Sequence, residues 1–200
     1  MRIRLMAAFC LLVMGSLAAA AQMGTGGTAK GPDAGTIVTP AVALDSELSL
    51  IEGEMMGAVK AMPAEKFGFA PSASIFVPGQ TIEFATVRTF AQQATHVAQA
   101  NYFFFATLSG LKPEVDMKAM AKLTNKDDVV AALAGSFAFG HKAIATLTAA
   151  NAFEVLKTPE PGIQTRSTFA GFAVSHANDH YGQMIEYLRM NGIVPPASAK

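Results

Sequence analysis

The sequence SHANDHYGQMIEYLRMNGIVPP, residues 175–196, places two histidines four positions apart and ends in Asn-Gly and a Pro-Pro pair. This order of residues predicts the last part of a long helix. Gly192 suits the left-handed position just beyond a helix end, Ile193 can pack back against the last turn, and Pro195 prevents the helix from continuing. We therefore expect a helix from about Arg166 to Asn191.

Both histidines belong to the apolar side of this predicted helix. Its stripe follows spacings of four, three, four, four and three residues and contains Phe169, Ala173, His176, His180, Met184 and Tyr187. Such spacings keep side chains on one helical face. That face should point into the protein, where an imidazole needs a polar partner.

Three more helices are predicted upstream, at about residues 40–61, 81–109 and 126–153. Thr39 followed by Pro40 marks the first start, because the threonine oxygen accepts an unpaired N–H and proline loses nothing at the first helical position. A capping box of Thr124 with Asp127 marks the start of the third. Residues 62–80 contain three prolines without helical spacing and predict an ordered connection.

The chain of 200 residues is 51% hydrophobic and 15% charged, so it can bury one sizeable core. Four long helical segments without a convincing strand predict an all-α fold, a four-helix bundle over residues 39–196. The charges balance at 15 basic and 15 acidic residues, and no basic stripe indicates nucleic acid binding. A small-molecule partner and a homodimer are both compatible with this composition.

Residues 1–21 have the layout of a secretory signal peptide, with two arginines before an apolar run that ends in small residues. We expect cleavage at its end, a flexible linker over residues 22–38, and export to the periplasm or the outside of the cell. A retained anchor is the alternative, but the run is short for a membrane span, so none is expected after cleavage. Cys10, the only cysteine, lies in this segment, which leaves the mature protein without disulfide or thiol.

Histidines four apart on a helix can bind one metal ion. Their Cβ atoms lie roughly 5–6 Å apart, so two imidazole nitrogens can converge at about 2.0–2.1 Å from a zinc ion. Taken alone, this spacing is a weak signal, because ordinary core or surface histidines are the commoner explanation for His176 and His180. His96, between Gln92 and Gln99 on the second predicted helix, fits a solvated polar face as well as a metal site.

Two segments, residues 61–105 and residues 175–196, carry a resemblance to a known family. The chain resembles the DinB-like superfamily of bacterial four-helix bundles, whose members typically have one histidine midway along the second helix and two on the last. His96, His176 and His180 match these positions, and the resemblance therefore implies a three-histidine site for a divalent metal ion. One departure is Tyr181, where many members have an arginine.

Three neutral imidazoles without a carboxylate leave a bound divalent ion its full charge and an open position, which lowers the pKa of bound water towards roughly 7. Zinc or nickel fits this ligand set best, and manganese or iron is also compatible. The expected function is a metal-dependent hydrolase or thiol-type transferase acting on a small molecule. The resemblance implies thiol-dependent transferases as one activity class, but export argues against that role, since reduced thiols are scarce outside the cytoplasm. The alternative is a non-catalytic metal-binding or structural bundle of the cell envelope.

Three other residues bear on the candidate site. Gln183 lies three positions after His180 on the ligand face and is expected to position a water molecule, although it cannot take a proton. Asp179 is either an acceptor for a ligand N–H or an exposed helix charge. His141 matches no position of the family and is expected at the edge of the core or on the surface rather than as a fourth ligand.

Overall fold

The computed structural model describes residues 31–72, 79, 86–157, 162 and 164–199. The chain divides into a unit that ends at Thr36 and a unit from Ile37 onwards, and all the helices found among the described residues lie in the second. The predicted signal peptide and the first part of the predicted linker fall outside the described residues. No helix in the described part of the chain is both long and apolar enough to cross a membrane.

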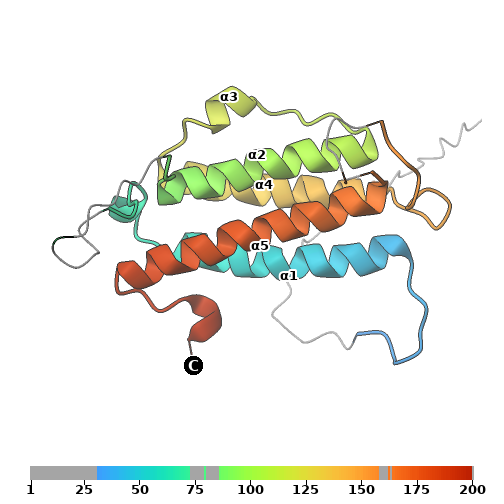
Figure 1. Ribbon diagram of the computed structural model, residues 1–200, viewed down its shortest axis with the longest axis horizontal. Helices are drawn as coiled ribbons and strands as arrows, with labels where there is room; N and C mark the ends of the chain where they lie inside the picture. Colours follow the sequence, from blue (N-terminus) through green and yellow to red (C-terminus); the bar gives the residue numbers. More distant parts are fainter. Residues whose placement is uncertain (1–30, 73–78, 80–85, 158–161, 163, 200) are drawn as a thin grey trace, which may run out of the picture. The chain divides into compact units, whose positions relative to one another are not determined.

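Four long helices form the second unit (Figure 1). They are α1 (Pro40–Ala61), α2 (Phe90–Ser109), α4 (Lys126–Ile144) and α5 (Arg166–Met190). Shorter elements are α3 (Met117–Met120) and the 3₁₀ turns η1 (Ala64–Lys66) and η3 (Pro196–Ser198). The only bridge of β type among the described residues is an isolated one between Val155 and Thr165. The predicted all-α four-helix bundle is confirmed.

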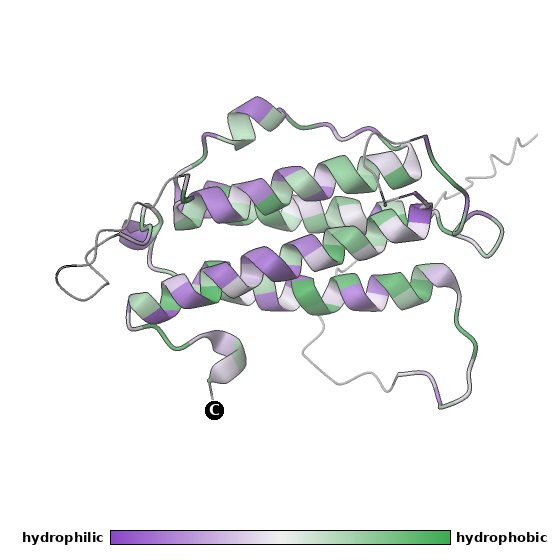
Figure 2. Cartoon of the chain, viewed as in Figure 1, coloured by the Kyte–Doolittle hydropathy of each residue, from purple (hydrophilic) through white to green (hydrophobic). Residues whose placement is uncertain are grey.

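The helices pack in a closed ring. Both α1 and α2 contact α4 and α5, so α1 and α2 lie across the bundle from each other. The largest fully buried side chains include Phe67, Phe90, Phe105, Phe137 and Phe169, which fill the interior between them. Of the four long helices α5 is the least hydrophobic, and Figure 2 shows hydrophilic residues along its middle. Hydrophilic residues are therefore part of the bundle along the middle of α5.

The predicted ends of α1 and α5 agree with the structure. Thr39 precedes α1 and accepts a hydrogen bond from the backbone N–H of Val42, with proline at the first helical position. Past the end of α5, Gly192 adopts a left-handed conformation with φ of 72°. The next N–H, that of Ile193, donates to the carbonyl of Leu188 at 3.0 Å, which closes the last turn as expected.

The predicted start of α2 near Thr81 is wrong, because the residues just before Phe90 are not helical. Thr89 caps the helix in a capping box with Gln92. The first two N–H groups of the helix, on Phe90 and Ala91, donate to carbonyls of residues 69 and 67 in the preceding connection. Tertiary hydrogen bonds therefore set this boundary, and the helical spacing of the sequence does not reveal them.

The third predicted helix also differs at both ends. Its cap is Asn125 rather than Thr124, since the Asn125 side chain accepts from the N–H groups of Asp127 and Asp128. The helix ends at Ile144 instead of near residue 153. A turn follows it, in which the Asn151 side chain accepts from the N–H of Thr148 and donates to the carbonyl of Thr146. The short helix α3, capped by the side chain of Asp116, was not expected.

Candidate metal centre

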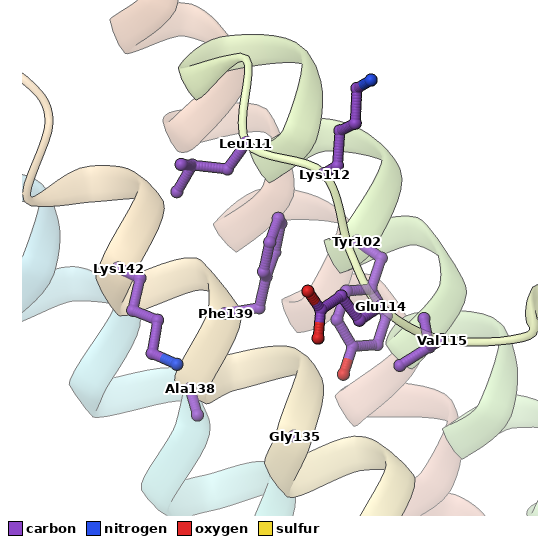
Figure 3. Close-up of a pocket in the computed structure, with 9 residues that line it drawn as sticks. All are labelled: Tyr102, Leu111, Lys112, Glu114, Val115, Gly135, Ala138, Phe139 and Lys142. Carbon is purple, nitrogen blue, oxygen red and sulfur yellow. The ribbon is translucent and has the colours of Figure 1, made fainter.

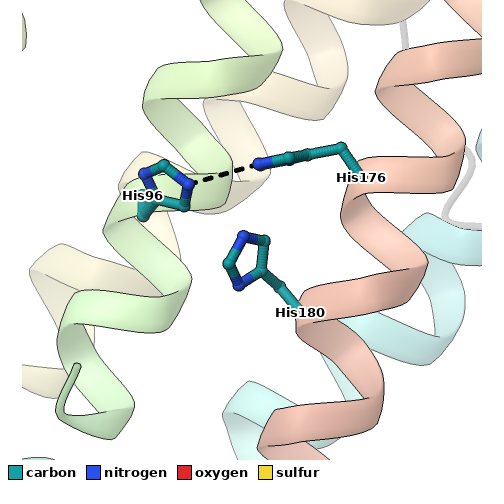
Figure 4. A group of neighbouring side chains, drawn as sticks. All are labelled: His96, His176 and His180. Atoms are coloured by element: carbon teal, nitrogen blue, oxygen red, sulfur yellow. Dashed lines mark hydrogen bonds between the residues drawn. The ribbon is translucent and has the colours of Figure 1, made fainter. Parts of the chain in front are cut away.

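Three histidines from two helices meet on one side of the bundle. His96 lies on α2, and His176 and His180 lie one turn apart on α5, which packs against α2. One nitrogen from each ring lies within 4.8 Å of the others (Figure 4). His180 is buried, and the other two are half-buried. The predicted convergence of these residues, which are up to 84 positions apart in the sequence, is confirmed.

The spacing of the ring nitrogens fits a metal ion. His96 Nε2 and His176 Nε2 are 3.2 Å apart. Two nitrogens that each bind zinc at about 2.0–2.1 Å lie roughly 2.9–3.4 Å apart at the usual coordination angles. Figure 4 shows one ring nitrogen of His180 facing the same space, and the contributing group contains no carboxylate. The three side chains therefore form a group that could hold a divalent ion.

The surroundings of the cluster keep its imidazoles neutral. Burial lowers the pKa of His96 to about 4, with smaller contributions from the charges of Arg88 and His176. Burial likewise lowers the pKa of His180 to about 4, assisted by the other two histidines. The pKa of His176 is also lowered, mainly by burial. A neutral imidazole has a free lone pair, so at neutral pH the cluster is ready to bind a metal ion.

A chain of side-chain hydrogen bonds leads from the surface to His180. Gln183 Nε2 lies 3.0 Å from Asp179 Oδ2, and Gln93 Nε2 lies 2.8 Å from Gln183 Oε1. Gln93 Oε1 then lies 2.6 Å from His180 Nδ1. Gln93 itself is only 2% exposed, so these partners take the place of water.

The chain fixes the proton of His180. An ionised carboxylate only accepts, so Gln183 must donate its amide N–H to Asp179 and accept from Gln93 through its oxygen. Gln93 then turns its own oxygen to His180, whose Nδ1 must carry the hydrogen. The lone pair of His180 is therefore on Nε2, which faces the other two histidines. This is the arrangement in which a second residue orients a metal-binding imidazole.

Gln93 is the functional residue that the sequence analysis missed. It lies three positions before His96, so the two side chains lie beside each other on the surface of α2. This spacing was the sequence signal that could have identified Gln93. Asp179 is exposed and is joined to His180 by hydrogen bonds through Gln183 and Gln93, and its charge also acts on His180 directly, so neither of its two expected roles describes it fully. Gln183 is the middle of the chain, and its expected role in positioning water stays a prediction.

The other polar residues considered have separate partners. Gln92 belongs to the helix cap, and Gln99 Nε2 donates to the carbonyl of Met117 at 2.7 Å, which ties α3 to α2. His141 has its partners outside the cluster. Its Nδ1 lies 2.6 Å from Asp45 Oδ1, and its Nε2 lies 2.9 Å from Glu52 Oε2. It is partly buried between α4 and α1, as expected for a residue at the edge of the core.

Two hollows meet at the histidine cluster. One, of about 390 Å³, is lined by Thr86, Val87 and Arg88 just before α2, by Gln92, Thr95, His96 and Gln99 of α2, and by Ala121 just after α3. The second, of about 450 Å³, is lined by His96, Gln99, Ala100, Phe103, Phe104, Met117, Phe172 and His176. His96 and Gln99 line both. The cluster therefore borders both hollows through His96.

A larger hollow of about 540 Å³ lies between α2, α4 and residues 111–115 and includes none of the three histidines. Figure 3 shows Tyr102, Glu114, Phe139 and Lys142 around it. Charges of both signs line this hollow, and no set of ligating side chains converges there among the described residues.

Comparison with known proteins places this arrangement in a family. The family model described as the DinB superfamily matches residues 47–184, which include all three histidines. Among solved structures, a DinB-like protein from Bacillus cereus is similar, with a TM-score of 0.62 and 16% sequence identity over 78% of this chain and 95% of that one. A comparison with curated protein sequences found no match. The match over most of the bundle means that this chain belongs to the DinB superfamily.

Proposed function

We propose that the protein is a metal-dependent enzyme that acts on a small molecule, with His96, His176 and His180 as the ligands of a divalent ion. The observation that carries this proposal is the approach of three neutral imidazole nitrogens to within 4.8 Å of one another, with one of them held in a fixed tautomer by Gln93. Histidines with a purely structural role would not have to direct their lone pairs towards one point. Zinc or nickel is the proposed ion because imidazole suits both.

Hydrolysis is the proposed reaction class, with a thiol-type transferase as the related alternative. His96, His176 and His180 would hold the ion, and a zinc ion held by three neutral imidazoles would lower the pKa of water to about 7 and so supply a nucleophile at neutral pH. The protein contributes the orientation of one ligand, His180, through the chain of hydrogen bonds that begins at Asp179. It also leaves hollows on both sides of His96 through which a substrate can approach.

Export of the mature protein belongs to the same proposal and rests on the charged, then apolar, then small-residue order of residues 1–21. A protein in the periplasm would work without a cytosolic thiol pool, which favours hydrolysis over thiol transfer. N-terminal sequencing of the protein from its native host tests this point. A mature chain that begins near residue 22 supports export, and an intact N-terminus contradicts it.

Metal analysis of untagged protein, purified without added metal, tests the proposed site. About one equivalent of a divalent ion is expected, and chelation should abolish hydrolysis in a screen of small esters, amides and thiol conjugates. Readdition of zinc or nickel should restore it. Stoichiometric metal without any turnover would instead favour a non-catalytic metal-binding bundle of the cell envelope.

A further inference from the structure

The two hollows beside the cluster have opposite chemical character. The smaller one is bordered by Arg88, Gln92 and Thr95, and the larger one by aromatic and aliphatic side chains. Both include His96 and Gln99, so they adjoin at the cluster rather than lying at separate places on the surface. A single molecule that spans both would pass His96, the one histidine of the cluster that lines both hollows.

The smaller hollow offers a positive charge. Arg88 is exposed, and its guanidinium makes no ion pair with any residue in the described part of the chain. Its backbone is fixed, because the Tyr187 hydroxyl donates to the Arg88 carbonyl at 3.0 Å. Gln92 and Thr95 add polar groups along the same wall. A guanidinium suits a carboxylate or another small anion, which it binds through paired hydrogen bonds.

The larger hollow offers an aromatic surface. Phe104 lies against Phe172 with ring centroids 5.0 Å apart and against Phe103 with centroids 5.4 Å apart, both in edge-to-face geometry. The Phe104 ring also contacts the ring of His176, at 5.7 Å. Although they border this hollow, Phe103 is 45% exposed and Phe172 is 41% exposed. Large aromatic side chains left exposed around a concave surface typically contact an apolar ligand.

We propose that the two hollows form one binding site for a small molecule with an anionic group at one end and an aromatic body at the other. The anionic end lies at Arg88, the aromatic body lies among Phe103, Phe104 and Phe172, and the bond between the two parts lies over the histidine cluster. This assignment names the substrate class and rests on the proposed function for the identity of the site as an active site. An amide or ester that links an aromatic acid to a small carboxylate has this shape.

Titration calorimetry with three related probes tests the proposal. N-benzoylglycine carries the ring, an amide and the carboxylate, N-benzoylglycinamide lacks the charge, and N-acetylglycine lacks the ring. Because a carboxylate also binds zinc, the metal-free protein is titrated first and the zinc-loaded protein second. N-benzoylglycine should bind about 10-fold or more tightly than either analogue in the metal-free protein, since both ends contribute.

Two variants locate the ends, each with a matched control. Arg88→Gln should remove the preference for N-benzoylglycine over its amide, whereas Lys142→Gln, in the separate hollow of Figure 3, should leave it unchanged. Phe172→Ala should remove the preference over N-acetylglycine, whereas Phe153→Ala, a more exposed phenylalanine outside both hollows, should not.

Equal binding of the three probes, or variants that match their controls, would overturn the proposal. Metal content is measured on the same samples, which separates the two claims. A protein that holds zinc through the histidines but shows no probe preference contradicts only the substrate class. A protein that takes up no metal contradicts the proposed function, while the metal-free titrations still decide whether the two hollows bind an anionic aromatic molecule.

Discussion

Gln93 Oε1 accepts a hydrogen bond from His180 Nδ1 at 2.6 Å, and this contact links α2 to α5 directly behind the histidine cluster. The imidazole can rotate about its side-chain bonds, but only one orientation keeps this bond. In that orientation Nε2 faces His96 and His176. The bond therefore sets both the position and the tautomer of one proposed ligand.

Replacing Gln93 should weaken metal binding without unfolding the bundle. Gln93→Leu keeps a similar volume but removes the acceptor, so the His180 ring loses its orientation and about 10–100-fold of metal affinity is expected to be lost. Competition with a chromophoric zinc chelator measures the affinity. The control is Gln92→Leu, which removes only the cap bond to Thr89 and should retain the affinity. Equal affinities for the two variants would contradict the positioning role.

The bundle and the three histidines could be predicted because their signals are local or carried by the family resemblance. The local signals lie within a few residues of the helix or helix end that they predict. They are Thr39, Gly192 and the apolar stripe around His176. Gln93 could not be assigned a role in this way. Its partners Gln183 and His180 come from α5, and only the packing of the two helices brings them within hydrogen-bond distance.

The start of α2 shows the same limit. Helical spacing continues upstream of Phe90, but carbonyls of Phe67 and Phe69 accept the first N–H groups of the helix and set its boundary. Such a pairing depends on how the connection folds back, which no short pattern of residues encodes. Arg88, which lines the smaller hollow, therefore precedes the helix instead of lying within it.

His141 should stabilise the fold in a pH-dependent way. Burial alone would lower its pKa, but hydrogen bonds to Asp45 and Glu52 and their charges outweigh burial and raise it. A raised pKa in the folded state means that the stabilisation is fully present below the unfolded value of about 6.5 and is lost as the pH rises through the folded value. Because these groups are partly exposed, we expect His141→Gln to cost roughly 0.5–1 kcal/mol at about pH 6.

Urea unfolding of the wild type and His141→Gln at several pH values checks this expectation. The difference in unfolding free energy should shrink as the pH rises through the raised folded-state pKa of His141. The variant Asp45→Asn, Glu52→Gln should lose the same pH dependence. A difference that stays constant with pH would show that His141 contributes through packing alone.

Gly140 should not tolerate alanine. A Cβ atom at this position would lie 2.7 Å from the Phe105 ring, at the contact between α4 and α2, and 3.0 Å from Leu48. Both neighbours are fully buried, so relief requires movement in the core, and a loss of about 1–3 kcal/mol is expected. Gly171→Ala, in α5 with open space around the new atom, should instead be neutral or stabilising by up to about 1 kcal/mol. Thermal unfolding of both variants measures the contrast.

Metal binding should persist at mildly acidic pH. Protons compete with a metal for imidazole, and the pKa values of about 4 for His96 and His180 move this competition well below the usual value of 6.5. The zinc affinity should therefore change little between pH 8 and about pH 6 and fall steeply only at lower pH. Competition titrations at fixed ionic strength would show this. A decline already centred near pH 6.5 would mean that the imidazoles behave as exposed groups.

His180 should be needed for metal but not for the fold. The bundle buries a large apolar core of its own, so loss of one ligand should not unfold it. In His180→Ala, bound metal should fall to background while the helical circular dichroism stays close to that of the wild type, and His141→Ala should keep its metal. If the histidines were only structural, His180→Ala would change the stability by roughly 0.5–3 kcal/mol with no metal to lose.

The decisive sample is the double variant His96→Ala, His180→Ala, because one remaining imidazole cannot hold the ion. Stoichiometric divalent metal in that protein would exclude the ligand assignment and the hydrolytic function that depends on it.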